Sequence, residues 1–480
     1  MNRPLPEPVD AVLDADDVHA ERRAFRAGRV RLAFFTSAGS KALGLLVQFL
    51  AVPLAVRSLG PERFGLYTML VSALVWIDLG RLGIGPGLTR ELALAWNRDE
   101  RERERTIFSN AMFFLFGMAG LIGIALLLGY HAGAAHLDVV FGPSVERYRG
   151  EIVAGIAVVG LFLVAQVIFS AGEAARSAYQ DDFINNLMNA LANLASLLLV
   201  FWVALWMPTI WAFALAVFGA IALGKGVNFV LLLTGSRPYL FPRWRFVDRG
   251  SFRLLLGSSI AFWVAQVAVL LMHNLSLVQL GQSIGAQALT PFAVVFRLLQ
   301  LLSTAVLMIS MPLWPAITDA AVRGDRKWIV ASYRRLVMMA LLFSGAAAMG
   351  IALLGSMLIP LWAGATVQVN PMLSTLLGAY FVIWMWNHCH STVLFGLGRL
   401  WPVAWIMLIE GLAVLGLAML LIPGYGATGT AMALCIAGVL VSGWLLPLVL
   451  RRTLARPFDV SATSSAAPPA GPTLSEEPIP

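Results

Sequence analysis

The chain has 480 residues, of which 59% are hydrophobic and only 12% are charged. Soluble globular domains carry about 25% charged residues, so this composition excludes a water-soluble fold and indicates an all-α polytopic membrane protein. The formal net charge of +8 is typical of basic loops that meet anionic lipid headgroups, so membrane lipids rather than a nucleic acid are the expected partners.

The N-terminal segment, residues 1–32, is polar and carries charges of both signs. It lacks the apolar core of a cleavable signal peptide, so we expect membrane insertion to begin with the first apolar block. At the other end, residues 451–480 are basic and then rich in Pro, Ser and Ala. This composition predicts a disordered tail.

Twelve apolar blocks lie between these segments, each near the roughly 20 residues that cross ~30 Å of hydrocarbon. We predict spans at 33–57, 65–88, 107–130, 151–175, 184–206, 209–234, 254–279, 286–312, 335–360, 371–395, 401–423 and 427–450. The first six form an N-terminal six-helix bundle over 33–234, and the last six form a C-terminal bundle over 254–450. A basic cytoplasmic linker, 235–253, joins the two bundles.

Arginine and lysine cluster in the connections that twelve spans place on one side of the membrane. These clusters lie near 22–31, 90–105, 237–253, 323–335 and 451–456. The opposite side carries little beyond Arg57, Arg63, Arg147 and Arg149. By the positive-inside rule, both termini are predicted to be cytoplasmic.

A weak internal repeat accompanies this pattern. The stretch VRSLGPERFGLYTML (56–70) is echoed by LVQLGQSIGAQALTPF (277–292), and each follows a long apolar span and opens another. Because six spans per unit is an even number, the two bundles share one orientation and form a parallel repeat. Two such bundles predict a central cavity and alternating access.

Charged groups near the bilayer centre cost at least ~2.5–3.5 kcal/mol, so they mark candidate sites. In the first span, Lys41 and Gln48 lie seven residues apart and share a helix face. Lys41 is also close enough to the cytoplasmic end to snorkel there. In the second span, Asp78 and Arg81 lie one turn apart. They either face the cavity or form a pair that neutralises both charges.

The seventh and eighth spans carry the matching polar groups of the second bundle. Ser259, Gln266 and His273 recur every seven residues in the seventh span. Arg297 lies near the middle of the eighth span, with Gln300 one turn away. We expect Arg297 to face the cavity, and a structural partner such as a carboxylate is the alternative.

Other polar residues inside the spans have weaker cases. Glu410 is a candidate for ion coupling, because burial favours the protonated form of a carboxyl. Lys225, His388 and His390 are more typical of contacts between helices. The stripe Asn186, Asn189, Asn193 and Ser196 either lines a cavity or joins helices, and we favour the second reading.

No motif predicts catalysis. GAIALGKG (219–226) nearly matches a phosphate-binding loop, but it lies inside an apolar span without a preceding strand. Cys389 and Cys435 fall inside spans and are expected to be packing residues. The connections between spans are too short for an enzymatic domain. No catalytic residue, metal or cofactor is therefore expected.

One stretch resembles a known family. SLGPERFGLYTMLVSALVWIDLGRLGIGPGLTRELA (58–93) is similar to the second-span region of Wzx-type oligosaccharide flippases. The matching positions are Leu59, Gly60, Phe64, Gly65, Tyr67, Asp78, Gly80, Leu88, Arg90, Glu91 and Ala93. The stretch from Arg297 through Pro312 to Pro315 more loosely resembles the eighth span of the wider superfamily, which includes multidrug/toxin extruders and lipid II flippases.

The resemblance implies a MATE-like fold in the bacterial inner membrane. It also implies translocation of undecaprenyl-pyrophosphate-linked oligosaccharide for surface polysaccharide (O-antigen, capsule or exopolysaccharide) biosynthesis, with other polysaccharide assembly proteins as further partners. In that role Arg297, Arg81 and Lys41 would attract the pyrophosphate and Asp78 would orient Arg81. Gln300, His273 and Gln266 complete the expected substrate-binding set.

Two other classes stay open. A cation-coupled multidrug extruder would be expected to keep an acidic cavity, whereas Arg and Lys dominate the deep sites here. A membrane enzyme of lipid-linked sugar chemistry would need a carboxylate cluster at the cytoplasmic face, and the sequence offers no convincing one.

Overall fold

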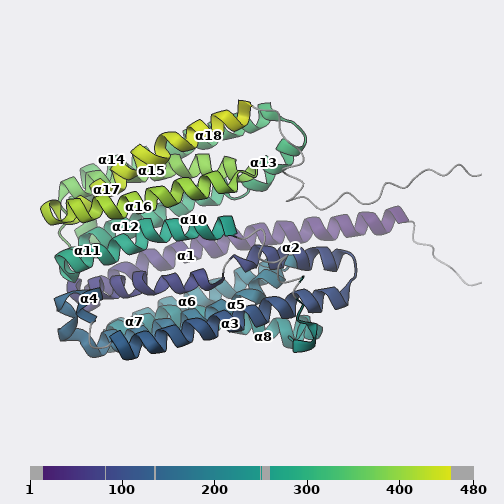
Figure 1. The fold of residues 1–480 in the computed structure, drawn as a ribbon, viewed down its shortest axis with the longest axis horizontal. Helices are drawn as coiled ribbons and strands as arrows, with labels where there is room; N and C mark the ends of the chain where they lie inside the picture. Colours follow the sequence, from purple (N-terminus) through teal and green to yellow (C-terminus); the bar gives the residue numbers. More distant parts are fainter. Residues whose placement is uncertain (1–14, 82, 134–136, 249, 251–259, 456–480) are drawn as a thin grey trace, which may run out of the picture.

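The computed structural model describes residues 15–455 except 82, 134–136, 249 and 251–259. Its regular structure is helical throughout, with no strand among these described residues, and the long helices run roughly along one axis (Figure 1). The expected all-α polytopic fold is therefore confirmed. The segment 1–14, the tail 456–480, part of the linker and Ser259 lie outside the described residues.

The first half of the chain builds one group of helices, drawn from purple to teal in Figure 1. Four short 3₁₀ turns and two π turns interrupt or connect these helices. Their bounds are α1 Ala15–Leu74, η1 Val75–Arg81, α2 Ile84–Asn97, α3 Arg101–Gly133, α4 Leu137–Phe141, η2 Pro143–Tyr148, α5 Arg149–Ala178, α6 Asp182–Trp206, α7 Ile210–Ala214, η3 Leu215–Gly219, α8 Ala220–Leu231, η4 Leu232–Ser236, η5 Pro238–Leu240 and η6 Trp244–Phe246.

The second half packs beside the first and is drawn from teal to yellow (Figure 1). Two of its elements are π turns, η7 and η8. The bounds are α10 Ile260–Leu270, η7 Leu271–Leu275, α11 Ser276–Ile284, α12 Ala286–Ser310, α13 Leu313–Val322, α14 Arg326–Ala363, α15 Pro371–Gly396, α16 Leu400–Tyr425, α17 Ala427–Ala437, η8 Gly438–Ser442 and α18 Gly443–Ala455.

Within the described residues, ten helices are long and apolar enough to cross a membrane. The first of them, Gly39–Arg81, contains two passes, because α1 bends back on itself at Gly60. The helix α15, with 26 residues, supplies a further pass between α14 and α16. The structure therefore contains the expected twelve passes.

Two glycines make the sharp bends that the repeat requires. Gly60 has φ 78° and ψ 167°, and Gly285 has φ 85° and ψ 157°, so each ends one span and opens the next in the same way. Residues with a Cβ rarely adopt this backbone conformation. In the sequence repeat, Gly60 aligns with Gly281. The residue that shares the backbone conformation of Gly60 is instead Gly285, four residues later. Gly281 is helical, and a Cβ there would overlap the side chain of Met69.

The second span differs from the expected continuous helix. It changes to the 3₁₀ turn η1 after Leu74 and restarts as α2 after Gly83, which has φ 69°. In the second half, a turn at Met311 and Pro312 separates α12 from α13 in a similar manner. The helices that follow the breaks, α2 and α13, both lie toward the side of the molecule where α1 begins (Figure 1).

The two halves meet tightly at the opposite end, where Gly60 and Gly285 lie. A Cβ on Gly65 would overlap the carbonyl oxygen of Ala286, and the Thr290 hydroxyl donates to the Pro61 carbonyl at 2.6 Å. Arg57 donates to the carbonyl oxygens of Leu361 and Trp362 at 2.8 and 3.1 Å. We call this set of contacts the closed end.

The described part of the linker, 235–248 and 250, is attached to α3. The backbone N–H of Asp248 donates to Asn110 Oδ1 at 3.0 Å, and Asn110 Nδ2 donates to the Phe246 carbonyl at 3.1 Å. Tyr239 donates to Glu104 at 2.6 Å. Burial and this hydrogen bond raise the pKa of Tyr239, so the phenol stays protonated and keeps donating at neutral pH. These described residues of the linker are therefore fixed to the first half of the molecule.

Candidate functional site

A cavity of about 240 Å³ lies between the two halves of the molecule. The first half contributes residues of α1, α6, α7, η3 and α8, and the second half contributes residues of η7, α11 and α12. We call it the central cavity. Because both halves line it, any relative movement of the halves changes its shape.

Neutral polar groups cover much of the wall of the central cavity. They are Gln48, Tyr67, Thr68, Ser72, Asn193, Ser196, Asn274 and Gln300. Arg297 is the one Lys or Arg among the described lining residues, and none of them is Asp or Glu. The cavity therefore carries one fixed positive charge among amide and hydroxyl groups.

Arg297 lies in the middle of α12, and its side chain is solvent-accessible because it lines the cavity. Its Nη1 donates to Gln300 Oε1 at 3.0 Å, so the two residues one turn apart act together. Tyr67, from the first half, lines the same cavity close to the guanidinium. Within the described chain no carboxylate forms an ion pair with Arg297, so its remaining donors are free for an anionic ligand.

The π turn η7 decides which residues of the seventh span reach the central cavity. Asn274 lines the cavity, whereas the preceding His273 is buried in the second half. His273 Nε2 lies 2.7 Å from the Tyr380 hydroxyl, and its ring packs 4.8 Å from that of Trp384 and 5.1 Å from that of Phe296. His273 thus reaches the cavity only through its neighbours Asn274 and Phe296, which line it.

Lys41 lies outside the lining of the central cavity. Its Nζ is 3.8 Å from Met311 Sδ, at the end of the molecule where α12 stops. Gln48, seven residues further along the same helix, does line the cavity. The first span therefore presents its amide to the cavity and its ammonium group near the helix end.

Asp78, Arg81 and Gln266 lie apart from Arg297. Arg81 Nη2 is 2.9 Å from Asp78 Oδ1, so the two form the intrahelical ion pair that the sequence allowed. Asp78 and Gln266 both line a second cavity, of about 780 Å³, which we call the seam cavity. Of the expected substrate-binding set, two residues line each cavity, and the remaining three, Lys41, Arg81 and His273, line neither.

Glu410 is buried in the second half, with 4% of its surface exposed. It lies on α16, where a Cβ on Gly438 of η8 would sit 3.4 Å from its Oε1. The Ser442 hydroxyl lies within hydrogen-bonding reach of the carboxyl, and Tyr380 is near enough to interact with it electrostatically. Tyr380 therefore stands between Glu410 and His273.

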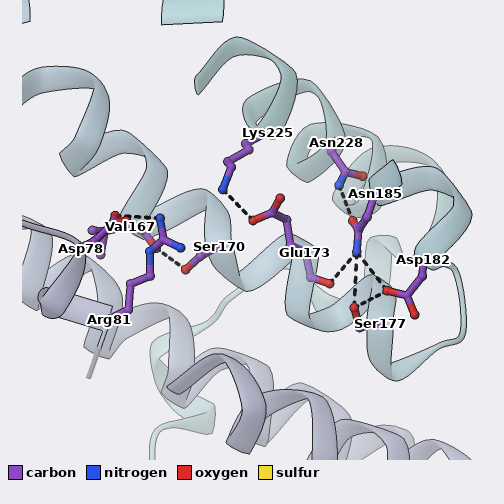
Figure 2. Close-up of polar contacts among 10 residues, drawn as sticks. All are labelled: Asp78, Arg81, Val167, Ser170, Glu173, Ser177, Asp182, Asn185, Lys225 and Asn228. Carbon is purple, nitrogen blue, oxygen red and sulfur yellow. Dashed lines mark hydrogen bonds and ion pairs between the residues drawn. The ribbon is translucent and has the colours of Figure 1, made fainter. Parts of the chain in front are cut away.

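A separate polar cluster connects α5, α6 and α8 in the first half, as Figure 2 shows. Lys225 Nζ pairs with Glu173 at 3.0 Å, and Asn228 Nδ2 donates to Asn185 Oδ1 at 2.7 Å. Asn185 Nδ2 in turn donates to the Glu173 carbonyl at 3.0 Å. Lys225 is therefore a contact between helices, as its isolated position in the sequence indicated.

The stripe of polar residues on α6 both contacts a neighbouring helix and lines a cavity, the two roles that the sequence left open. Asn186 donates to Thr36 of α1 at 3.3 Å, whereas Asn193 and Ser196 line the central cavity.

Sequence reasoning did not select Tyr67 or Asn274 as site residues. Tyr67 lies in the motif that carried the family resemblance, so a signal for it was present. Asn274 carried no such signal, because its exposure depends on the π turn.

Residues 33–321 match the profile of a family described as Polysaccharide biosynthesis protein. Among curated proteins, one named as an O-antigen transporter of Salmonella typhi is 20% identical over 414 residues, which cover 84% of this chain and 91% of that protein. One named as an O-antigen export protein of Yersinia pseudotuberculosis is 20% identical over 436 residues, which cover 87% and 95%.

Solved structures of multidrug resistance MATE family transporters of the MOP superfamily share the fold. An inward-facing one has a TM-score of 0.73 at 15% identity and covers 88% of this chain and 96% of its own. An outward-facing one has a TM-score of 0.63 at 15% identity, with 88% and 95% covered. At this identity the likeness shows the fold alone, and it confirms the expected MATE-like architecture.

Proposed function

Because the chain belongs to the polysaccharide biosynthesis protein family, we propose that it is a flippase for an oligosaccharide linked to undecaprenyl pyrophosphate. It is a multi-pass membrane protein with a MATE-like fold. The relatives named for O-antigen transport or export support a transporter rather than an enzyme. The substrate would serve the biosynthesis of a surface polysaccharide.

The observation that carries the proposal is the chemistry of the central cavity. Arg297 offers a guanidinium, which binds phosphate oxygens through charge-assisted hydrogen bonds. The amides of Gln48, Asn193 and Asn274 are suited to sugar hydroxyl groups, since they both donate and accept hydrogen bonds. A ligand with an anionic head and a neutral glycan matches this wall.

The chemistry of the central cavity also distinguishes the proposed flippase from a multidrug extruder, which is the alternative function because it has the same fold. A site for cationic drugs needs an acidic group, and the described lining residues of the central cavity include none. The single arginine there would repel a cation instead. The rival therefore predicts transport of cationic dyes, which the test below includes.

The closed end supports transport by alternating access, because its contacts join the two halves beside the central cavity, as Thr290 to Pro61 does. The basic connections at the other end support an orientation with both termini in the cytoplasm of a bacterial inner membrane. On this orientation the closed end faces the periplasm, and transport would require it to separate.

Glu410 is the group that we assign to ion coupling. Its carboxyl is buried beside Ser442 and close to Tyr380, whose hydroxyl lies 2.7 Å from His273 Nε2. Uptake and release of a proton at Glu410 would change the charge inside the second half and bias its packing. Among the described residues, the other titratable groups in this region are Tyr380, His273 and Cys435.

The decisive experiment follows surface polysaccharide in cells that lack the native protein. Replacement by the Arg297→Ala variant should abolish the polysaccharide while the protein remains inserted in the membrane. The matched control is Arg323→Ala, because Arg323 is exposed, pairs with Asp319 and does not line the central cavity. Normal polysaccharide with Arg297→Ala, or loss of cationic dye export instead, would contradict the proposal.

A further inference from the structure

The seam cavity differs from the central cavity in size and chemistry. It has a volume of about 780 Å³, within the range of roughly 300–1,000 Å³ that small-molecule sites occupy. Its wall is largely apolar and includes Ala265, Val269, Leu270, Trp314, Phe395 and Met407. The first half contributes η1, and the second half contributes α10, α13, α15 and α16. The seam cavity therefore also lies between the halves.

The seam cavity and the central cavity follow one another along the same helix faces. In the first half, Thr68 and Ser72 line the central cavity and Val75 and Leu79 line the seam cavity. These four residues are spaced by three or four positions, which places them on one face. In the second half, Asn274 lines the central cavity, and Leu270, four residues earlier, lines the seam cavity.

The broken helix η1 fixes the mouth of the seam cavity. Trp263 Nε1 donates to the Leu79 carbonyl at 3.0 Å and connects the halves beside the lining residues. Asp78 lines the seam cavity and pairs with Arg81, and both side chains are partly exposed, by 38% and 28%. Among the described residues, Asp78 contacts only Nη2 of Arg81, and 28% of the Arg81 side chain is exposed. The exposed part of the guanidinium is therefore available to an anionic head beside the largely apolar wall.

We propose that the seam cavity binds the head-proximal part of the hydrocarbon chain of the lipid carrier, with Arg81 meeting its phosphate at the mouth. This assignment rests on the proposed function. From the seam cavity, the phosphate head of the lipid can move toward Arg297 along the helix faces that line both cavities. The hydrocarbon chain of the lipid meanwhile stays in apolar surroundings. The apolar wall supplies the affinity, because each buried CH₂ group contributes favourably.

The test compares two probes on the full-length protein in detergent: farnesyl pyrophosphate, with head and chain, and inorganic pyrophosphate, with the head alone. The variant Val269→Trp fills the seam cavity. We expect it to weaken the binding of farnesyl pyrophosphate about tenfold, the equivalent of roughly two buried CH₂ groups. The affinity for inorganic pyrophosphate should stay unchanged. The matched control is Val230→Trp, because Val230 is exposed on α8 and lines neither cavity.

Unchanged binding of farnesyl pyrophosphate by Val269→Trp would overturn the assignment. Equal competition by dioleoylphosphatidylglycerol would also overturn it, because the site would then hold bulk lipid. If Val269→Trp does not fold, the wild-type protein is labelled with a polyprenyl pyrophosphate that carries a diazirine in its first isoprene units. Labelled peptides around Trp314 and Phe395 support the assignment, and labelling elsewhere refutes it. Failure of the proposed function would give a different result: the Arg297→Ala variant would bind pyrophosphate as tightly as the wild-type protein does.

Discussion

Gly65 of α1 and Ala286 of α12 touch backbone to backbone, so closely that a single methyl group on Gly65 would overlap the Ala286 carbonyl oxygen. The contact joins the two halves of the molecule at the closed end. It stands beside the hydrogen bond from Thr290 to the Pro61 carbonyl. Closure of this end therefore depends on a residue without a side chain.

Gly65→Ala should force the closed end apart and cost about 1–3 kcal/mol of stability, as overpacking does elsewhere. Thr68→Cys, which lines the central cavity, reports the change as faster labelling by an impermeant maleimide from outside the cell. Gly39→Ala is the control, since nothing lies within 4 Å of a Cβ there. Equal labelling in both backgrounds would show that Gly65 does not control closure.

Arg297→Lys should retain part of the transport that Arg297→Gln loses. A lysine keeps the charge but offers no planar fork for two phosphate oxygens. Loss of a charge-assisted hydrogen bond costs about 1.5–3 kcal/mol, so pyrophosphate affinity should fall roughly 10- to 100-fold in Arg297→Gln. Titration calorimetry of the purified variants measures this. Equal affinity in Gln and Lys variants would exclude a role for the charge.

Reversal of the Asp78–Arg81 ion pair separates its contribution to stability from its proposed contribution to transport. The pair is partly exposed, so the double variant Asp78→Arg with Arg81→Asp should change stability by less than about 1 kcal/mol. Transport should nevertheless fall, because the cation moves from position 81 to the wall of the seam cavity. Thermal unfolding and polysaccharide export are measured on the same variant. Wild-type export would remove Arg81 from the lipid path.

Glu410→Gln should uncouple transport from a pH gradient. The amide keeps the shape of the carboxyl beside Ser442 but cannot release a proton. In proteoliposomes, an imposed pH gradient should accelerate uptake by the wild-type protein and leave Glu410→Gln unaffected, while exchange at equal pH persists in both. A variant that still responds to the gradient would exclude Glu410 as the coupling group.

Asn228→Ala should destabilise the first half without altering the central cavity. It removes the acceptor of Arg176 Nε, at 3.1 Å, and the donor to Asn185. Buried groups left without partners cost about 1–3 kcal/mol each. Tryptophan fluorescence during thermal unfolding measures the loss. Asn97→Ala is the control, because the Asn97 side chain is exposed and donates within its own helix.

Most of the passes were predictable, because ten of the described helices are long and apolar enough to cross a membrane. The contact of Arg297 with Gln300 was also predictable, since residues three apart meet on any regular helix. The seven-residue spacing of Gln266 and His273 misled, because η7 begins between them and its wider turns rotate every residue that follows. Gln266, which precedes η7, lines the seam cavity, whereas within η7 His273 is buried and Asn274 lines the central cavity.

The unbalanced charge of Arg297 has an electrical consequence. On the proposed function, the loaded cavity combines one positive guanidinium with a doubly negative pyrophosphate, so its net charge is negative, whereas the empty cavity is positive. A voltage that is negative inside the cell therefore drives the loaded site outward and draws the empty site back. Each net charge that crosses 100 mV gains ~2.3 kcal/mol, so a single uncompensated arginine lets the resting membrane potential favour both strokes of the cycle.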